Sequence, residues 1–204
     1  MAGHEYSAAD ITVLEFDEAV RKRPGMYFEV GLDDPRLPMK LLEAAARHAL
    51  HPATRVAEVH SLVAAIDILD DLCFQVTIKQ RHAWADSPLL GYFDSLIGPE
   101  WWLLAAIATL CGTTSVDVWS EDRAFRQELT GLRPSGPPER IGSPMGSGIR
   151  IAFTLDEQIL PAGTALPTEL ESLDAHGPDC APGGPGYVLV HDHRPDSRSS
   201  IRLS

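Results

Sequence analysis

The amino-acid sequence predicts an α+β fold, a two-layer sandwich in which helices cover one side of a sheet. Short segments of alternating apolar and polar residues are joined by two-residue turns, as in hairpins. Other segments place apolar residues three and four positions apart, as amphipathic helices do. The segment Glu100–Leu110 is apolar on all sides, which is typical of a helix inside a core. Helices and hairpins of this kind bury their apolar sides on one another.

The composition indicates one acidic domain. The chain has 204 residues, of which 44% are hydrophobic, and a formal net charge of −12. This length supports one core, so we predict a single domain over residues 1–204. Proteins that bind nucleic acid neutralise phosphates with a basic surface, so this acidic chain is not expected to bind nucleic acid directly.

The cysteines and the N-terminus indicate a cytoplasmic protein without a metal or a membrane segment. Cys73, Cys111 and Cys180 are odd in number and lack the spacing of a metal site, so we expect reduced thiols. The first residues do not resemble a signal peptide, and no apolar run approaches the roughly 18 residues of a membrane span. His191 and His193 share one strand face without a third ligand nearby in sequence, so no metal ligand is assigned.

The helices are predicted from their apolar spacing and their ends. A polar arm, residues 1–12, precedes a short helix that has Arg21–Arg23 in its last turn and stops at Pro24 and Gly25. After a loop, Pro38 suits the first turn of a helix that runs to about Leu50. A further short helix is expected around Leu89–Leu96.

The strands are predicted from alternation, with turns at Asp70-Asp71 and Glu121-Asp122. Residues 161–186 are rich in turn-forming residues and are expected to form a loop, and residues 196–204 a flexible tail. The predicted strands are Val63–Leu69, Cys73–Gln80, Ser115–Trp119, Ala124–Thr130, Gly148–Phe153 and Tyr187–His191.

The segment from Ile11 to Tyr27, which ends in Arg-Lys-Arg-Pro-Gly-Met-Tyr, resembles the N-terminus of the GHKL-type ATPase domain of the DNA gyrase B subunit and its topoisomerase IV relative. The resemblance covers roughly residues 6–195. It implies helices on a mixed, mostly antiparallel sheet, in a lone domain that no transducer or cleavage module follows. The other segments that follow the family's order and spacing are 116–119, 125–127, 140–142, 148–153 and 190–195.

One helix of this family carries a catalytic Glu and, four residues later, an Asn that binds magnesium. The corresponding residues here are Glu43 and Arg47. A guanidinium group has donors and no acceptor, so Arg47 cannot bind magnesium. We predict instead that Glu43 and Arg47 form a helix ion pair worth about 0.3–0.5 kcal/mol.

The other nucleotide motifs also depart from the family pattern. Where the family has Asp-x-Gly-x-Gly, residues 80–84 are Gln-Arg-His-Ala-Trp, without the adenine-binding Asp or either Gly. The glycine-rich lid is replaced by Gly-Pro-Glu-Trp-Trp-Leu at residues 98–103, which removes a donor and repels phosphate. Ile149 follows Gly148 where the family presents a Thr to the adenine. ATP hydrolysis by the family mechanism is therefore not expected, and no cofactor is assigned.

The residues that replace the nucleotide contacts leave two interpretations open. In the first, they form a pocket that binds or converts a small planar, partly apolar molecule without ATP, with Glu43 and His82 as candidates for general acid–base catalysis. In the second, tryptophans fill the former cavity, and the chain is a non-catalytic interaction protein that pairs with gyrase B-type subunits. The candidate ligand-binding residues are Arg47, Gln80, Arg81, Trp84, Trp101, Trp102 and Ile149.

The N-terminal arm of this family embraces a second copy of the domain. The resemblance therefore implies a homodimer, formed through Tyr6 and Ile11 of the arm. A monomer whose arm folds back on its own domain is the alternative.

Overall fold

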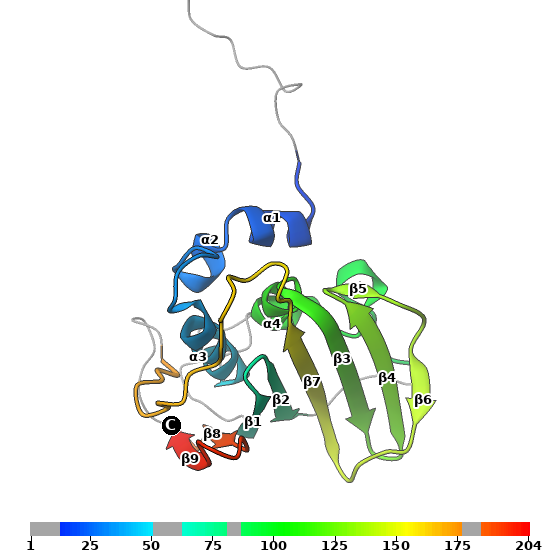
Figure 1. Cartoon of the computed structure of the whole chain (residues 1–204). Helices are drawn as coiled ribbons and strands as arrows, with labels where there is room; N and C mark the ends of the chain where they lie inside the picture. The colour runs from blue at the N-terminus through cyan, green and yellow to red at the C-terminus, as the bar shows by residue number, and fades with distance from the viewer. Residues whose placement is uncertain (1–12, 51–62, 81–86, 177–184) are drawn as a thin grey trace, which may run out of the picture.

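The computed structural model describes residues 13–50, 63–80, 87–176 and 185–204. They form two layers, a sheet and a group of helices (Figure 1). The helices are α1 (Phe16–Lys22), α2 (Gly25–Phe28), α3 (Leu37–Leu50) and α4 (Trp102–Ala108), with 3₁₀ turns η2 (Tyr92–Asp94) and η3 (Pro99–Trp101). The strands are β1 (Val63–Asp70), β2 (Cys73–Lys79), β3 (Cys111–Ser120), β4 (Arg123–Thr130), β5 (Arg133–Pro134), β6 (Glu139–Ile141), β7 (Ser147–Leu155), β8 (Tyr187–Asp192) and β9 (Ser199–Leu203).

The described strands form one mixed sheet, in the order β5-β4-β3-β7-β2-β1-β8-β9, with β6 also paired to β4. Every pairing among them is antiparallel except that of β1 with β8. The predicted α+β class and the mostly antiparallel sheet are thereby confirmed.

The core lies between the sheet and the helices. Ile66, Val76 and Ile151 are aligned on neighbouring strands, and none is more than 1% exposed. Helix α3 contacts β1, β2 and β8, and α4 contacts β3 and α3. All of α4 after its first residue is buried, as the apolar pattern predicts for a helix inside a core.

Aromatic and charged side chains fix α1 to the rest of the domain. Phe16 stacks on Tyr92 with ring centroids 4.6 Å apart and meets Tyr27 edge-on at 5.9 Å. Arg21 Nε donates a hydrogen bond to the Thr109 carbonyl at 2.8 Å, at the end of α4. These contacts join α1, α2, η2 and α4 into one layer.

Three predicted elements differ from the structure. Pro24 and Gly25 do not begin a loop directly but start the one-turn helix α2. The helix expected around Leu89–Leu96 is reduced to one 3₁₀ turn, because Phe93 and Asp94 have positive φ angles. The tail predicted to be flexible contains β9, which pairs with β8.

Strand β9 is held from both faces of the sheet. Ile201 and Leu203 pack against the core, and the Arg202 guanidinium lies 4.1 Å from the ring centroid of Tyr187. The alternation of apolar and polar residues in Ser-Ile-Arg-Leu was the available signal for this strand.

Arg194 anchors the turn-rich segment to the end of the sheet. Its guanidinium contacts the Asp192 carboxylate at 2.6 Å, the Asp71 carboxylate at 2.9 Å, and the carbonyls of Leu166 at 2.9 Å and Pro167 at 2.8 Å. Burial pushes the pKa of Asp192 upward, but the hydrogen bonds from Arg194 outweigh this effect and hold the pKa below its usual value. The described residues of the predicted loop, 161–176 and 185–186, contain turns and bends but no helix or strand.

A membrane-spanning helix is not found in the described ranges, where every helix is too short or too polar to cross a bilayer.

Candidate functional site

Helix α3 presents Glu43 and Arg47, one turn apart, toward α2 and α4. Both side chains line a small pocket whose free volume is about 20 Å³, little more than one water molecule needs. The other lining residues are Tyr27, Phe28, Glu29, Lys40, Ala44 and Leu103.

The charged side chains of this pocket form a chain of ion pairs. Lys40 Nζ lies 2.8 Å from Glu43 Oε2 and 3.1 Å from Glu29 Oε2. Arg47 Nη1 lies 3.5 Å from Glu29 Oε1. The predicted pair between Glu43 and Arg47 is therefore wrong, because Glu29 supplies the carboxylate for Arg47 and Lys40 supplies the cation for Glu43.

Glu29 reaches this position because of its backbone conformation. It is the C-cap residue that follows α2 and has a φ of 66°, in the left-handed region. The hydrogen bond from Lys40 holds the pKa of Glu29 below its usual value, and the hydrogen bonds to Glu43 and Glu29 raise the pKa of Lys40.

The tryptophans join the start of α4 to α3. Trp101 is 1% exposed, and its ring lies 5.5 Å from that of His48, measured between centroids. Trp102 contacts His48 at 5.8 Å and Tyr27 at 6.2 Å. His48 Nε2 lies 2.9 Å from the Glu100 carbonyl oxygen, so the same helix end is also held by a hydrogen bond. Trp101 thus fills the interior and does not form an open wall.

Two buried donors near these helices have no hydrogen-bond acceptor in the described part of the chain. They are Arg47 Nε and Trp101 Nε1. An unsatisfied buried donor costs about 1–3 kcal/mol. An acceptor on a water or a bound molecule would recover that cost.

The remaining candidates lie at the sheet. Ile149 is 1% exposed and faces the helices between Ile78 and Val118 of the neighbouring strands. Gln80 directly follows β2 and is half-buried. Arg81, His82 and Trp84, and the arm residues Tyr6 and Ile11, lie outside the described residues.

Sequence reasoning did not identify Lys40 and Glu29 as parts of this site. Lys40 stands three residues before Glu43, a helical spacing that would have indicated the pair. Glu29 is separated from Arg47 by a loop, and no local pattern indicates their contact.

Metal-binding geometry is not found in the described ranges, which contain no group of three or more His, Cys, Asp and Glu side chains suited to one ion. His193 Nε2 lies 2.8 Å from Asp67 Oδ1, and His191 Nδ1 lies 2.8 Å from Ser200 Oγ. Both imidazoles are thus hydrogen-bonded on the outer face of the sheet.

Comparison with known proteins identifies relatives in both sequence and structure, although no family model matches the chain. Over 180 residues, the chain is 27% identical to the B-subunit of DNA topoisomerase 4 from Caulobacter vibrioides, in a match that covers 78% of this chain and 26% of the relative. The chain thus spans about a quarter of that relative's length. The B-subunit of the DNA gyrase from Myxococcus xanthus has the same fold, with a TM-score of 0.63 and 22% identity over 92% of this chain and 56% of that one.

Proposed function

Since this chain is a gyrase B-like domain, we propose that it acts without ATP, as an interaction protein that pairs with gyrase B-type subunits and modulates them. The observation that supports this most is the pocket at Glu43, with a free volume of about 20 Å³. Sites for organic ligands usually measure several hundred Å³.

The side chains around this pocket support a role without nucleotide. The family's magnesium ligand is replaced by Arg47, which is engaged with Glu29. Glu43 is engaged with Lys40, and Trp101, within the segment 98–103 that the resemblance aligns with the family's lid, is buried. A nucleotide would have to displace these contacts before it could bind.

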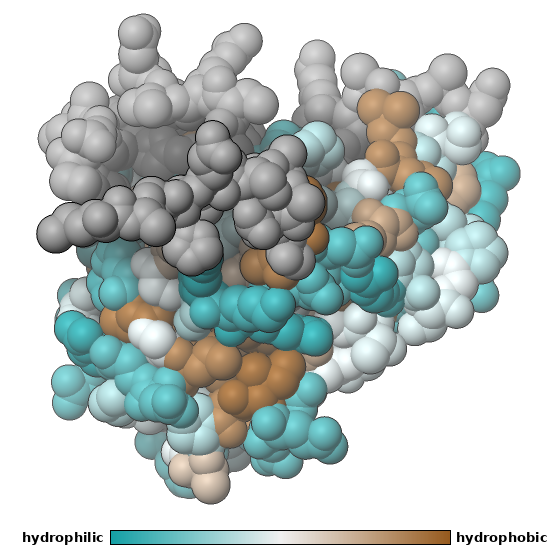
Figure 2. Space-filling model, turned by 90° about the horizontal axis from the view of Figure 1, so that it is seen from above, coloured by the Kyte–Doolittle hydropathy of each residue, from teal (hydrophilic) through white to brown (hydrophobic). Residues whose placement is uncertain are grey.

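Exposed apolar side chains near α1 and α2 support a protein partner. Val13 is 87% exposed, Met26 73% and Leu89 79%. Val13 precedes α1, Met26 lies in α2 and Leu89 precedes η2, and the contacts of Phe16 join these segments. Figure 2 looks down on this side and shows apolar surface bordered by hydrophilic side chains. Such surfaces commonly take part in protein association.

Two measurements test this proposal. Calorimetry with ATP and magnesium should give no heat of binding, and micromolar binding with phosphate release would contradict it. Sedimentation of the chain with a gyrase B-type subunit should give a mixed complex without nucleotide, and no complex at micromolar concentrations would refute the pairing. Met26→Asp should weaken that complex, whereas Met145→Asp, at a residue that is 99% exposed in the turn before β7, is the matched control.

A second candidate is a small planar molecule bound or converted at the same site, with Glu43 and His82 as acid–base groups. The observation in its favour is the pair of buried donors, Arg47 Nε and Trp101 Nε1, that lack an acceptor within the described residues. Native mass spectrometry of the purified protein should then detect a bound compound that Arg47→Met loses. If the spectrum shows only the mass of the protein itself, no compound is bound, and the interaction role is the better proposal.

A further inference from the structure

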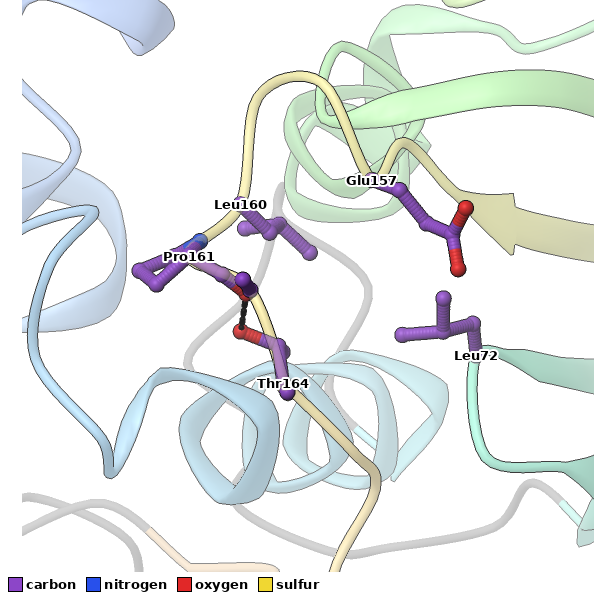
Figure 3. Close-up of a pocket in the computed structure, with 7 residues that line it drawn as sticks. Leu72, Glu157, Leu160, Pro161 and Thr164 are labelled. Atoms are coloured by element: carbon purple, nitrogen blue, oxygen red, sulfur yellow. Dashed lines mark hydrogen bonds between the residues drawn. The ribbon is translucent and has the colours of Figure 1, made fainter.

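A larger cavity lies beside the turn between β1 and β2. Leu72, in the turn between β1 and β2, faces the segment that follows β7, and together they line a partly open cavity of about 290 Å³. Figure 3 shows the carboxylate of Glu157 directed toward Leu72, with Leu160, Pro161 and Thr164 along the far wall. Among the described residues, none lines both this cavity and the pocket at Glu43.

The position of this cavity separates it from Gln80, a candidate ligand-binding residue. Leu72 precedes β2 and Gln80 follows it. At about 3.3 Å per residue, the strand places these ends roughly 25 Å apart. A ligand in the cavity at Leu72 would therefore not reach Gln80.

Backbone hydrogen bonds hold both walls of the cavity in place. Leu155 N–H donates to the Leu72 carbonyl at 2.9 Å, and Leu166 N–H donates to the Asp71 carbonyl at 2.7 Å. Arg194 binds both the Asp71 carboxylate and the Leu166 carbonyl. The cavity is thus formed before any ligand arrives, which lowers the entropic cost of binding.

The far wall is itself closed by a turn. Thr164 donates to the Pro161 carbonyl twice, from its N–H at 3.1 Å and from its hydroxyl at 2.6 Å. Leu160 N–H donates to the Asp156 carbonyl at 3.0 Å, which fixes the start of the same segment. The segment is therefore a formed structure that presents Ala162 and Gly163 to the cavity.

The lining chemistry defines the class of ligand. Leu72 is half-buried and supplies apolar surface, and Leu160 also lines the cavity although it is only 4% exposed. Glu157 is the only charged side chain among the described residues that line the cavity. We propose that this cavity is a binding site for a small organic cation, an amine carried on a compact apolar body, with the ammonium group at Glu157. Its volume lies at the lower end of the range for ligand sites, which suits a molecule of this size.

Phenethylamine is a suitable probe, with 2-phenylethanol and phenylacetate as its neutral and anionic counterparts. Amide NMR of the full chain should show saturable shifts with the amine at Leu72, Gly163 and Thr164, and much weaker binding of the other two. Glu157→Gln should lower the affinity for phenethylamine about five-fold. This factor corresponds to about 1 kcal/mol, the upper value for an exposed ion pair. Glu171→Gln, at an exposed carboxylate outside the cavity, should leave the affinity unchanged.

A second variant tests the cavity independently of the charge. Ala162 is exposed, so Ala162→Phe should fill the cavity without loss of folding and abolish binding. Shifts that map elsewhere, equal binding of the alcohol and the amine, or unchanged affinity in both Glu157→Gln and Ala162→Phe would overturn the proposal. These outcomes are independent of whether the chain pairs with a gyrase B-type subunit.

Discussion

Replacing Arg194 with methionine would remove the side chain that joins β8, the β1–β2 turn and the turn-rich segment. Arg194 is 6% exposed and Asp192 is 1% exposed, so the variant leaves a buried carboxylate without its cation. Breaking a buried pair in this way costs about 3–5 kcal/mol. The carbonyls of Leu166 and Pro167 also lose a donor, at about 1 kcal/mol each at the low end for an unsatisfied group.

Two features reduce the loss. Asp192 keeps the hydrogen bond from the Arg194 backbone N–H at 3.0 Å, and the Asp71 side chain is 66% exposed, so water can replace its lost contact. We therefore expect the free energy of unfolding to fall by about 3–5 kcal/mol in total, a large share of the 5–15 kcal/mol typical of a domain.

Urea denaturation followed by tryptophan fluorescence measures this loss. The double variant Asp192→Asn with Arg194→Met should recover part of the stability, because the buried charge is gone, and Arg198→Met, at an exposed arginine, should change it little. A loss below about 1 kcal/mol for Arg194→Met, or no recovery in the double variant, would refute the buried-pair reasoning.

Three further predictions concern stability in acid, packing at Gly148 and self-association. The pKa of Asp192 is depressed in the folded state, so its carboxylate contributes fully to the free energy of unfolding above the ordinary aspartate pKa of about 3.9. That contribution is lost as the pH falls through the folded pKa. The free energy of unfolding, measured as the pH is lowered, should show this loss in the native chain and less of it in Arg194→Met. Gly148→Ala should lower the free energy of unfolding by about 1–3 kcal/mol in urea titration, because the added Cβ would lie 2.5 Å from the Trp119 ring and 2.7 Å from the Ile78 carbonyl; an unchanged midpoint would contradict this. Light scattering should find a homodimer for the full chain and a monomer for a chain that begins at Thr12; a dimer in both would show that the arm is not its cause.

The sheet was largely predictable because its strands carry their own signal. The residues of β1 and β2 alternate in polarity, which predicts the side chains that face the core. The short connection between the two strands predicts that they pair with each other, without knowledge of the rest of the chain. The short strands β5 and β6 carry too few residues for any period, and they form only because β4 offers a partner. The resemblance to gyrase B supplied the arrangement that local patterns leave open.

The candidate site was less predictable because its contacts are long-range. The position of Glu43 on a helix followed from apolar spacing. Its ion pair did not, because both Lys40 and Arg47 lie within one turn of it on the same helix, and only the folded structure shows that Lys40 is its partner. Glu29 meets Arg47 only through the positive φ that ends α2, and a single sequence gives no sign of that angle. The buried state of Trp101 likewise depends on the packing of α4 against α3.

The parallel pairing of β1 with β8 determines when this domain can be completed during synthesis. Asp71 and Arg194 are 123 residues apart, and β1 has its second partner only after β8 has left the ribosome. Until then, one side of β1 exposes unpaired backbone groups, which other chains can bind. Contacts this distant in sequence also slow folding, because a long loop must close before they form. The nascent domain therefore depends on its last strands to protect its first ones, so a ribosome that stalls before Arg194 would hold an aggregation-prone intermediate.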